Sequence, residues 1–446
     1  MAGWREGLSG WLEPFLALLG HKARRRMCPL YVGGLIAPLE RKSMGPLAER
    51  MAPGDYDQLH HFIADAIWDE APLEQELARR ADGLVGGADA VLVVDDTALP
   101  KKGTRSVGVA PQYASALGKT ANCQTLVSLT LARREIPVVV GLRLFLPESW
   151  TADLARLELG RVPAEFRRAR TKLEIAVEEI DRLIGAGVRF SAVLADAGYG
   201  MSAAFRRELS VRKLAFAVGV PRHQMVYPAD VELAFPPSRG RRPRKWHVPN
   251  VPPVKAEDML ANTTWRSLTW REGVKGELRA SFAAVRVRVA DEEPRTVGSK
   301  RMQRGPGEEL WLVGEHRTSG ERKYYLASLP AGADLKTLAS VIKARWVCEQ
   351  AHQQMKEELG LDHFEGRSWP GLHRHALMTM IAYAFLQSRR LEAEAKGEKK
   401  NPRWPPKADP SSRQKSRRRR LRQKAGLSLP TLPKTHSSPH PMILPK

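Results

Sequence analysis

Cysteine is scarce in this sequence, and its scarcity argues against two kinds of cross-linked fold. The 446 residues include three cysteines, Cys28, Cys123 and Cys348, which are far apart and form no Cys-x-x-Cys pair. An odd number of widely separated cysteines argues against a disulfide framework and against a zinc finger. The same pattern is typical of proteins that work in a reducing compartment.

Long apolar runs are also missing. No segment approaches the ~18 consecutive apolar residues that a membrane-spanning helix needs. Apolar residues recur at helical spacing up to Leu19, but Arg5, Glu6 and Glu13 interrupt them. This pattern predicts an amphipathic helix rather than a signal peptide.

Acidic residues are too few to balance the basic ones. The chain has 49 Asp and Glu against 72 Lys and Arg, which gives a net charge of +23 and a pI near 10.2. From residue 391 onward 15 basic residues stand against 4 acidic ones, so +11 of the charge lies there and +12 in the remainder. Such a charge indicates a polyanionic partner, nucleic acid before an acidic membrane. We therefore expect a cytoplasmic, nucleoid-associated protein without a membrane partner.

The apolar segments that are present predict an α/β fold. Five short runs have the composition of buried strands, and helical spacing follows the third and the fourth of them. The predicted strands are 91–96, 123–132, 138–146, 189–196 and 214–220, with helices at about 165–184 and between 200 and 214. Three strands, a helix, a strand, a helix and a strand is the order of a ribonuclease H-like core, a mixed sheet with helices on its faces.

The rest of the chain divides around this core. Residues 1–85 look helical and carry a basic cluster at 21–26, which indicates either a solvated surface or a DNA-binding module without a clear helix-turn-helix signature. Alternating segments predict a β-rich insertion after the core strands, with strands at 282–290, 309–315 and 323–329. The predicted domains are 1–85, helical and a candidate DNA-binding domain; 86–220, the first part of the core; 221–333, the insertion; 334–390, the final core helices; and 391–446, a basic disordered tail.

A helix is expected from Asp334, a favourable start, to Gly360, a favourable stop. Polar residues spaced at i, i+4, i+7 and i+11 share one face of it: Arg345, Glu349, His352 and Lys356. From spacing alone, the preferred interpretation is a solvated face with weak ion pairs.

Two of the predicted strands end in acidic residues, Asp96 (preceded by Asp95) and Asp196. Strand ends are ordinary places for turn-forming Asp, so either residue alone is weak evidence. The pair is stronger evidence, because the first and fourth strands are neighbours in the predicted order and buried charges need partners. Glu349 from the later helix would complete a cluster of hard oxygen ligands, which suits Mg²⁺ or Mn²⁺.

Several segments resemble DDE-type insertion-sequence transposases of the cut-and-paste group, which carry an Arg/Glu/Lys signature and an Asp-Asp-Thr first motif. The segments that carry the resemblance are 94–109, 113–124, 194–200 and 345–375. The family spacing is Tyr, two residues, Arg, three residues, Glu, six residues, Lys. Arg345, Glu349 and Lys356 match this spacing, whereas the Tyr position is occupied by Ile342.

The resemblance implies a catalytic and metal-binding set of Asp96, Asp196 and Glu349, with Asp95 as a substitute for Asp96. It implies two Mg²⁺ or Mn²⁺ ions and in-line displacement at phosphorus. Hydrolysis would expose a 3′-OH at the element end, and that hydroxyl would then attack target DNA.

The resemblance also implies partners for the protein. Arg345 and Lys356 are expected to contact DNA phosphates near the cleaved strand. The DNA would be double-stranded, with terminal inverted repeats and a target site, held by a homodimer in a synaptic complex. Aromatic residues of the insertion hold a flipped base in similar enzymes, and the candidates here are Trp246, Trp265, Trp270 and Trp311. A Trp in a β-rich segment is more often part of a core.

Two other functions remain open. The first is a catalytically silent derivative that binds DNA as a repressor or architectural protein, although the presence of all three acids favours the enzyme. The second is a basic nucleic-acid-binding protein of unrelated ancestry, which the matched spacing disfavours. The His373-Arg374-His375 run suggests a metal site only weakly, because two His residues without further ligands more often contact phosphate or nothing.

Overall fold

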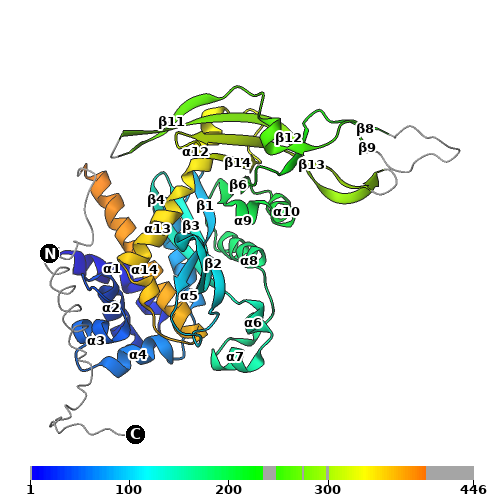
Figure 1. Cartoon of the computed structure of the whole chain (residues 1–446). Coiled ribbons are helices and arrows are strands. Elements are labelled where there is room, and N and C mark those ends of the chain that lie inside the picture. Colours follow the sequence, from blue (N-terminus) through cyan, green and yellow to red (C-terminus); the bar gives the residue numbers. More distant parts are fainter. Residues whose placement is uncertain (1–2, 235–247, 274–275, 298–300, 398–446) are drawn as a thin grey trace, which may run out of the picture. The chain divides into compact units, whose positions relative to one another are not determined.

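The structure is a computed structural model that describes residues 3–234, 248–273, 276–297 and 301–397 (Figure 1). Residues 235–247 of the predicted insertion lie outside the described residues, as does the predicted tail from residue 398 onward. The described residues pack as one unit.

A mixed sheet forms the centre of this unit. Its five main strands are β1 (Ala90–Pro100), β3 (Lys119–Arg133), β4 (Ile136–Phe145), β5 (Ala192–Ala195) and β6 (Phe216–Val220). They lie in the order β4-β3-β1-β5-β6, with β1 antiparallel to β3 and parallel to β5, and β5 parallel to β6. The first and fourth predicted strands are therefore neighbours, paired from Val91↔Ala192 to Val94↔Ala195. The composition did not predict β2 (Ala110–Ala114), which pairs with the start of β3.

Short helices connect these strands. They are α6 (Glu148–Thr151), α7 (Leu154–Leu159), α8 (Lys172–Gly185), α9 (Ala197–Gly200) and α10 (Ala203–Val211), with single 3-10 turns at Ser115–Leu117 and Ala164–Phe166. The predicted helix at about 165–184 begins later than expected. Thr171 and Glu174 form a capping box there, so the favourable start lies at residue 172.

The predicted insertion is β-rich, but its strands join the central sheet. The elements of this segment are β7 (Met225–Pro228), β8 (Leu233–Ala234), β9 (Val248–Pro249), β10 (Val254–Lys255), α11 (Ala256–Met259), β11 (Arg266–Gly273), β12 (Gly276–Val297), β13 (Arg301–Arg317) and β14 (Arg322–Ala327). β14 pairs with β6, from Tyr324↔Val220 to Ala327↔Ala217. The sheet then continues through β13, β12, β7 and β10, so one hydrogen-bonded sheet runs from the core into the insertion (Figure 1).

The helix expected from Asp334 to Gly360 is divided into α12 (Leu335–Ala344) and α13 (Trp346–Glu357), which meet at Arg345. The Asp334 side chain accepts a hydrogen bond from the Thr337 amide, as an N-cap does. Gly360 follows the second helix with φ of 73°, a conformation that favours glycine. Both predicted end signals therefore operate, although the helix between them is interrupted.

These two helices and α8 cover opposite faces of the sheet. Val91 and Val93 of β1 pack in one apolar cluster with Leu338 of α12 and Val347 of α13. Because successive strand side chains point to opposite faces, Leu92 and Val94 point the other way. The strands are therefore buried from both sides, which is why they are continuous apolar runs in the sequence.

A buried acid joins α12 to the insertion. Glu315 of β13 is fully buried and accepts bonds from Lys343 of α12 at 2.6 Å, from the Arg317 guanidinium at 2.9 Å and from the Tyr325 hydroxyl at 2.8 Å. Burial alone would raise the pKa of Glu315, but these partners lower it below its ordinary value. The contact fixes α12 two residues before Arg345.

The N-terminal segment is helical, as predicted. Its helices are α1 (Gly3–Leu18), α2 (Lys22–Ile36), α3 (Met44–Met51), α4 (Tyr56–Ala64) and α5 (Ala71–Val85), and the last helix of the described chain is α14 (Trp369–Ala395). These helices share a core with α14: Tyr31 of α2 bonds His375 at 2.8 Å, and Arg374 bonds Glu70 at 2.7 Å. α14 extends beyond the predicted end of the core at residue 390 and includes residues 391–395 of the predicted tail. None of the described helices is long and apolar enough to cross a membrane.

Arg143 of β4 is the centre of a buried ion network. Its guanidinium bonds Glu74 of α5 at 2.7 Å and Glu179 of α8 at 2.6 Å. Burial would raise the pKa of the Glu179 carboxyl, but Arg143 and Arg182 beside it lower that pKa below its ordinary value. One cation thus holds two helices onto the same strand.

We expect Arg143→Met to lower the free energy of unfolding by about 3–5 kcal/mol, because two buried carboxylates would lose their main partner. Urea unfolding measures the change. Arg168→Met is a matched control, since Arg168 pairs with Glu178 but its side chain is 64% exposed. That variant should lose less than about 1 kcal/mol. Equal losses in the two variants would contradict the structural role of Arg143.

Candidate active site

Asp95 and Asp96 lie on β1 and point to opposite faces of the sheet, because strand side chains alternate. Asp95 faces the junction of α12 and α13, where it contacts Arg345 and Cys348. Asp96 faces α8 and α9, where it contacts Lys172 and Tyr199. Two acids that are adjacent in sequence therefore have separate surroundings.

The Asp95 carboxylate is held from α13. Its Oδ2 accepts a bond from Arg345 Nη1 at 2.6 Å and one from the Cys348 thiol at 3.1 Å. Burial is the main reason that the pKa of Cys348 lies well above its ordinary value, and the negative charge of Asp95 raises it further. The thiol therefore keeps its proton and donates a hydrogen bond to Asp95. The side chain of Asp95 is only 14% exposed.

Arg345 bridges two of the candidate acids. Its Nη2 bonds Glu349 Oε1 at 2.8 Å while its Nη1 holds Asp95. Burial would lower the pKa of this guanidinium, but the carboxylates of Asp95, Glu349 and Asp196 raise it. The Glu349 side chain is 63% exposed, so it is accessible from solvent.

Asp196 follows β5 and caps the short helix α9. Its Oδ1 accepts bonds from the amides of Gly198 at 2.9 Å and Tyr199 at 3.3 Å. Burial raises the pKa of Asp196, and the negative charge of Asp95 raises it further. Asp95 affects Asp196 more than Asp96 does, so Asp95 and Asp196 belong to one electrostatic cluster with Arg345.

Asp96 is enclosed by two donors. The Tyr199 hydroxyl donates to Oδ1 at 2.6 Å, and Lys172 Nζ donates to Oδ2 at 2.6 Å. Both carboxylate oxygens are therefore engaged by residues of the neighbouring helices.

His352, the third residue of the predicted polar face, is buried and supports Asp95 indirectly. Ser128 of β3 donates its hydroxyl hydrogen to the Asp95 carbonyl oxygen at 3.1 Å, and its oxygen lies 2.7 Å from His352 Nε2. Because the hydroxyl has one hydrogen, His352 Nε2 donates to Ser128. Burial lowers the pKa of His352 to about 4, so the ring is neutral at pH 7.

Lys356, the fourth residue of that face, is half-buried on α13. Its ammonium makes no hydrogen bond or ion pair with any residue that the structure describes. Burial lowers its pKa, while the charges of Asp362 and Asp95 oppose the shift. A half-buried cation without an acidic partner near Asp95 is suited to bind an anion.

The C-terminal end of α13 is fixed by a buried lysine. Lys42 is 4% exposed and donates to the carbonyls of Leu35, at the end of α2, and Glu358, at the end of α13. The Lys42 amide also donates to His363 Nδ1 at 3.0 Å. A cation at two helix C-termini is favourable, but burial lowers its pKa from 10.5 to about 8.

This pKa predicts how stability depends on pH. Between pH 8 and 10.5 the unfolded chain keeps a proton on Lys42 that the folded chain has released, so the stability of the wild type rises with pH in this window. Relative to Lys42→Met, which lacks the proton, the wild type should gain about 3 kcal/mol across it. Urea unfolding at both pH values measures the gain. Lys102→Met, at an exposed lysine, should show no such change, and a pH-independent effect of Lys42→Met would contradict the assignment.

The donor chemistry of this region fits a divalent ion, whereas its present arrangement holds a guanidinium. Carboxylate oxygens of Asp95, Asp196 and Glu349 are the ligand type that Mg²⁺ and Mn²⁺ prefer. In the described part of the chain, however, no three His, Cys, Asp or Glu side chains are grouped closely enough to hold one metal ion. Arg345 lies between two of the three acids instead.

The His373-Arg374-His375 run is structural. His373 accepts from the Leu144 amide and bonds the Trp369 carbonyl, while His375 bonds Tyr31. Burial lowers the pKa of His373 to about 3 and that of His375 to about 4. All three side chains are buried, so they are not available for phosphate.

The tryptophan candidates have separate surroundings. Trp246 lies outside the described residues. Trp270 packs against the central apolar cluster, with the Lys343 ammonium 4.4 Å from its ring centre. Trp311 donates to the Pro330 carbonyl at 3.1 Å, and Trp265 lies half-buried 6.1 Å from the ring of His316.

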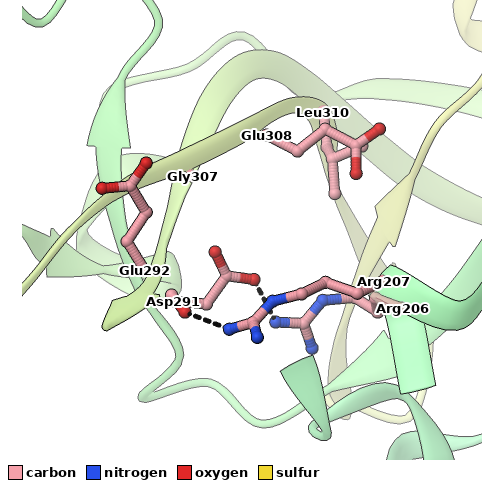
Figure 2. A pocket seen from close by; sticks show the side chains of 7 residues that line it. All are labelled: Arg206, Arg207, Asp291, Glu292, Gly307, Glu308 and Leu310. Atoms are coloured by element: carbon pink, nitrogen blue, oxygen red, sulfur yellow. Dashed lines mark hydrogen bonds and ion pairs between the residues drawn. The ribbon is translucent and has the colours of Figure 1, made fainter. Parts of the chain in front are cut away.

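A cavity of about 410 Å³ lies between α10 and the insertion, apart from these acids (Figure 2). Figure 2 shows the guanidiniums of Arg206 and Arg207 directed at Asp291, with Arg206 bonding its carboxylate and Arg207 its carbonyl at 2.8 Å each. Arg206 also donates to the Gly200 carbonyl at the end of α9. The paired charges join α9 and α10 to β12, and the cavity includes none of the three candidate acids.

Comparison with known proteins shows the family of this chain. A family model described as DDE superfamily endonuclease matches residues 14–277, which is more than half of the chain. The chain belongs to the DDE superfamily of endonucleases. The matched range includes the acids of β1 and Asp196 but ends before α12, so it does not include Glu349.

A curated relative and a solved structure that this chain resembles are described as transposases. The chain is 31% identical over 169 residues to a probable transposase for insertion sequence element IS701 from Microchaete diplosiphon, an alignment that covers 38% of this chain and 41% of that protein. The predicted resemblance to a DDE-type insertion-sequence transposase is confirmed. A piggyBac transposase structure, a synaptic complex with hairpin DNA, is 12% identical with a TM-score of 0.40 and covers 96% of this chain and 80% of that one. At this identity and TM-score we base no conclusion on the likeness.

Sequence reasoning missed the residues that surround the acids. Lys172 and Ser128 carry no motif of their own, and only their three-dimensional position reveals their contacts. Cys348 had a signal, because it precedes Glu349 within the segment 345–375 that carries the resemblance. Tyr199 had a signal, because it follows Asp196 within the segment 194–200 that carries the resemblance. The pattern also left Asp95 and Asp96 as alternatives, and their opposite orientations depend on the register of β1.

Proposed function

We propose that the protein is a DNA transposase that cuts the ends of its element and joins them to target DNA. The observation that carries this proposal is that Arg345 bridges Asp95 and Glu349 while Asp196 follows β5, the strand paired with β1, in a chain of the DDE superfamily. The strand order β4-β3-β1-β5-β6 supports a ribonuclease H-like core, in which the acid of the first strand and the acid that follows the fourth lie on neighbouring strands.

We assign the first ligand position to Asp95 rather than to Asp96, the residue that the motif favours. Asp95 shares Arg345 with Glu349 and is the acid that acts most strongly on Asp196. Asp96 faces the other side of the sheet, where it contacts Lys172 of α8 and Tyr199 of α9 instead of Arg345. Asp196 and Glu349 keep their predicted roles as ligands and catalytic residues.

The chain's own residues hold the DNA and its reacting atoms. Divalent ions, when bound, activate the attacking oxygen and neutralise the leaving oxygen in an in-line displacement at phosphorus. Asp95 is fixed in the middle of β1 and Asp196 directly after β5, whereas Glu349 projects from an exposed helix surface. In the first step water attacks the phosphorus and the 3′ oxygen of the element end leaves. In the second step that 3′-hydroxyl attacks a target phosphodiester, so one bond forms as another breaks.

Arg345 and Lys356 are proposed to contact phosphates of the cleaved strand. Lys356 already lacks an acidic partner among the described residues. Arg345 would leave Asp95 and Glu349 when a phosphate approaches, because guanidinium and phosphate form strong bidentate contacts. DNA binding would thereby release the acids for the ions. The net charge of +23 supports DNA as the partner, and a homodimer that holds two element ends is the expected assembly.

Cleavage of the element's own ends tests the proposal. The duplex is built from inverted repeats in the genomic flanks of the reading frame and is incubated with Mg²⁺. We expect nicking that EDTA abolishes. Glu349→Gln and Asp95→Asn should each reduce the nicking rate by about a hundredfold or more, because loss of a metal ligand costs more activity than loss of a residue that supports a ligand.

Glu357→Gln is the matched control, since Glu357 is an exposed acid on the same helix α13. Its cleavage should equal that of the wild type. Wild-type protein that binds the end duplex without cutting it would contradict the enzyme and support the catalytically silent derivative.

A second experiment tests the position of Arg345. Without DNA, Arg345→Ala should bind Mn²⁺ about tenfold or more tightly than the wild type, because two charge pairs no longer compete for the acids. Electron paramagnetic resonance of free Mn²⁺ measures the affinity. Adding the end duplex should strengthen Mn²⁺ binding by the wild type.

Arg212→Ala is the control for this measurement, because Arg212 also pairs with two carboxylates, Asp181 and Glu208, on another surface. It should leave Mn²⁺ binding unchanged. Equal affinities of the wild type and Arg345→Ala would show that Arg345 does not compete with the ion.

A further inference from the structure

The residues around Asp96 connect it to Asp196. Tyr199 donates its hydroxyl to Asp96 at 2.6 Å, and its own backbone amide donates to Asp196 Oδ1 at 3.3 Å. One residue therefore contacts both acids, one with its side chain and the other with its main chain. Lys172 of α8 binds the second oxygen of Asp96 at 2.6 Å.

The helix that carries Tyr199 is too short to hold itself in place. α9 spans four residues, Ala197–Gly200, and an isolated turn of this length is unstable in water. Its position must come from contacts with other elements. Tyr199 supplies one of them, since its side chain is 3% exposed and its ring lies 5.6 Å from that of Phe205.

On its other side α9 lies directly on β6. A Cβ on Gly200 would lie 2.0 Å from the Gly219 carbonyl oxygen, and a Cβ on Gly219 would lie 2.8 Å from the Ala197 amide nitrogen. The two glycines allow this close approach. α9 is thus held between β6 and the Asp96 carboxylate, and Asp196 is the N-cap residue that precedes it.

We propose that Asp96, Tyr199 and Lys172 form a brace that positions Asp196 for metal binding. In this role Asp96 is a positioning residue, and its charge binds the Tyr199 hydroxyl and the Lys172 ammonium rather than the ion. Asp196 Oδ1 is occupied by the amides of α9, and its Oδ2 accepts no hydrogen bond from any residue within the described ranges. The brace therefore fixes the direction of the oxygen that remains for a ligand. The metal-binding role of Asp196 in this inference rests on the proposed function, whereas the existence of the brace does not.

Tyr199→Phe is the sharpest variant, because it removes one hydroxyl and keeps the ring that packs against Phe205. In complexes with end DNA, Tyr199→Phe and Asp96→Asn should each weaken Mn²⁺ binding by about 10–100-fold, as is usual when a residue that orients a metal ligand is lost. Cleavage at saturating Mn²⁺ should stay within a few-fold of the wild type. Asp95→Asn should instead lose cleavage at every Mn²⁺ concentration.

Hydrogen exchange tests the brace without metal or DNA. Tyr199→Phe should speed exchange of the amides of residues 197–201 by about tenfold, since a hydrogen bond to a charged acceptor is lost. Tyr56→Phe, at a 48% exposed tyrosine of α4, is the control for both measurements and should change neither.

The outcomes separate the brace from the proposed function. Unchanged exchange at residues 197–201 in Tyr199→Phe would overturn the brace. A second pair of results would also overturn it: Asp96→Asn loses all cleavage while Tyr199→Phe keeps the Mn²⁺ affinity of the wild type. Together they would show that Asp96 binds the metal itself. A wild type that neither binds Mn²⁺ nor cuts, with faster exchange in Tyr199→Phe, would refute the enzyme and retain the brace.

Discussion

The attachment of α13 to the middle of β1 is the constraint on which the candidate site depends. A buried carboxylate is costly without partners, and Asp95 obtains them from a helix about 250 residues later in the chain. Arg345 and Cys348 hold its side chain, and His352 reaches its carbonyl through Ser128. These contacts fix both the helix axis and its rotation. Glu349, one turn after Arg345, therefore always projects on the side of Asp95.

Both ends of the α12–α13 pair are also anchored by buried charges. Lys343 binds Glu315 of the insertion just before the junction, and Lys42 of the N-terminal segment binds the last carbonyls of α13. Segments that composition separates into different domains thus determine the position of one pair of helices. Ion networks of this kind are specific rather than strongly stabilising, because desolvation offsets much of their attraction. Their effect is to select a single orientation of the catalytic helix.

The sequence predicted the features that depend on local composition. Apolar runs identified five core strands, and acids at two of their ends pointed to the site. Asp334 and Gly360 marked the ends of the late helices. The sequence could not reveal that the late helix divides into α12 and α13 at Arg345, because the backbone dihedral angles of Arg345 remain nearly helical. It also could not decide between Asp95 and Asp96, since a shift of one residue in register exchanges the two faces of a strand. The partners Lys172 and Ser128 depend on tertiary contacts, which no local pattern encodes.

The pairing of β14 with β6 has a consequence for how this architecture tolerates change. Without the insertion, β6 would end the core sheet and expose a row of unpaired amides and carbonyls, which can recruit a strand from another molecule. The segment from 221 to 333 therefore protects the core from self-association as well as enlarging it. A shortened homologue would need another cover for that edge, such as a helix, a proline or a row of lysines. Gain or loss of this segment in evolution is thus coupled to the residues of a strand outside it.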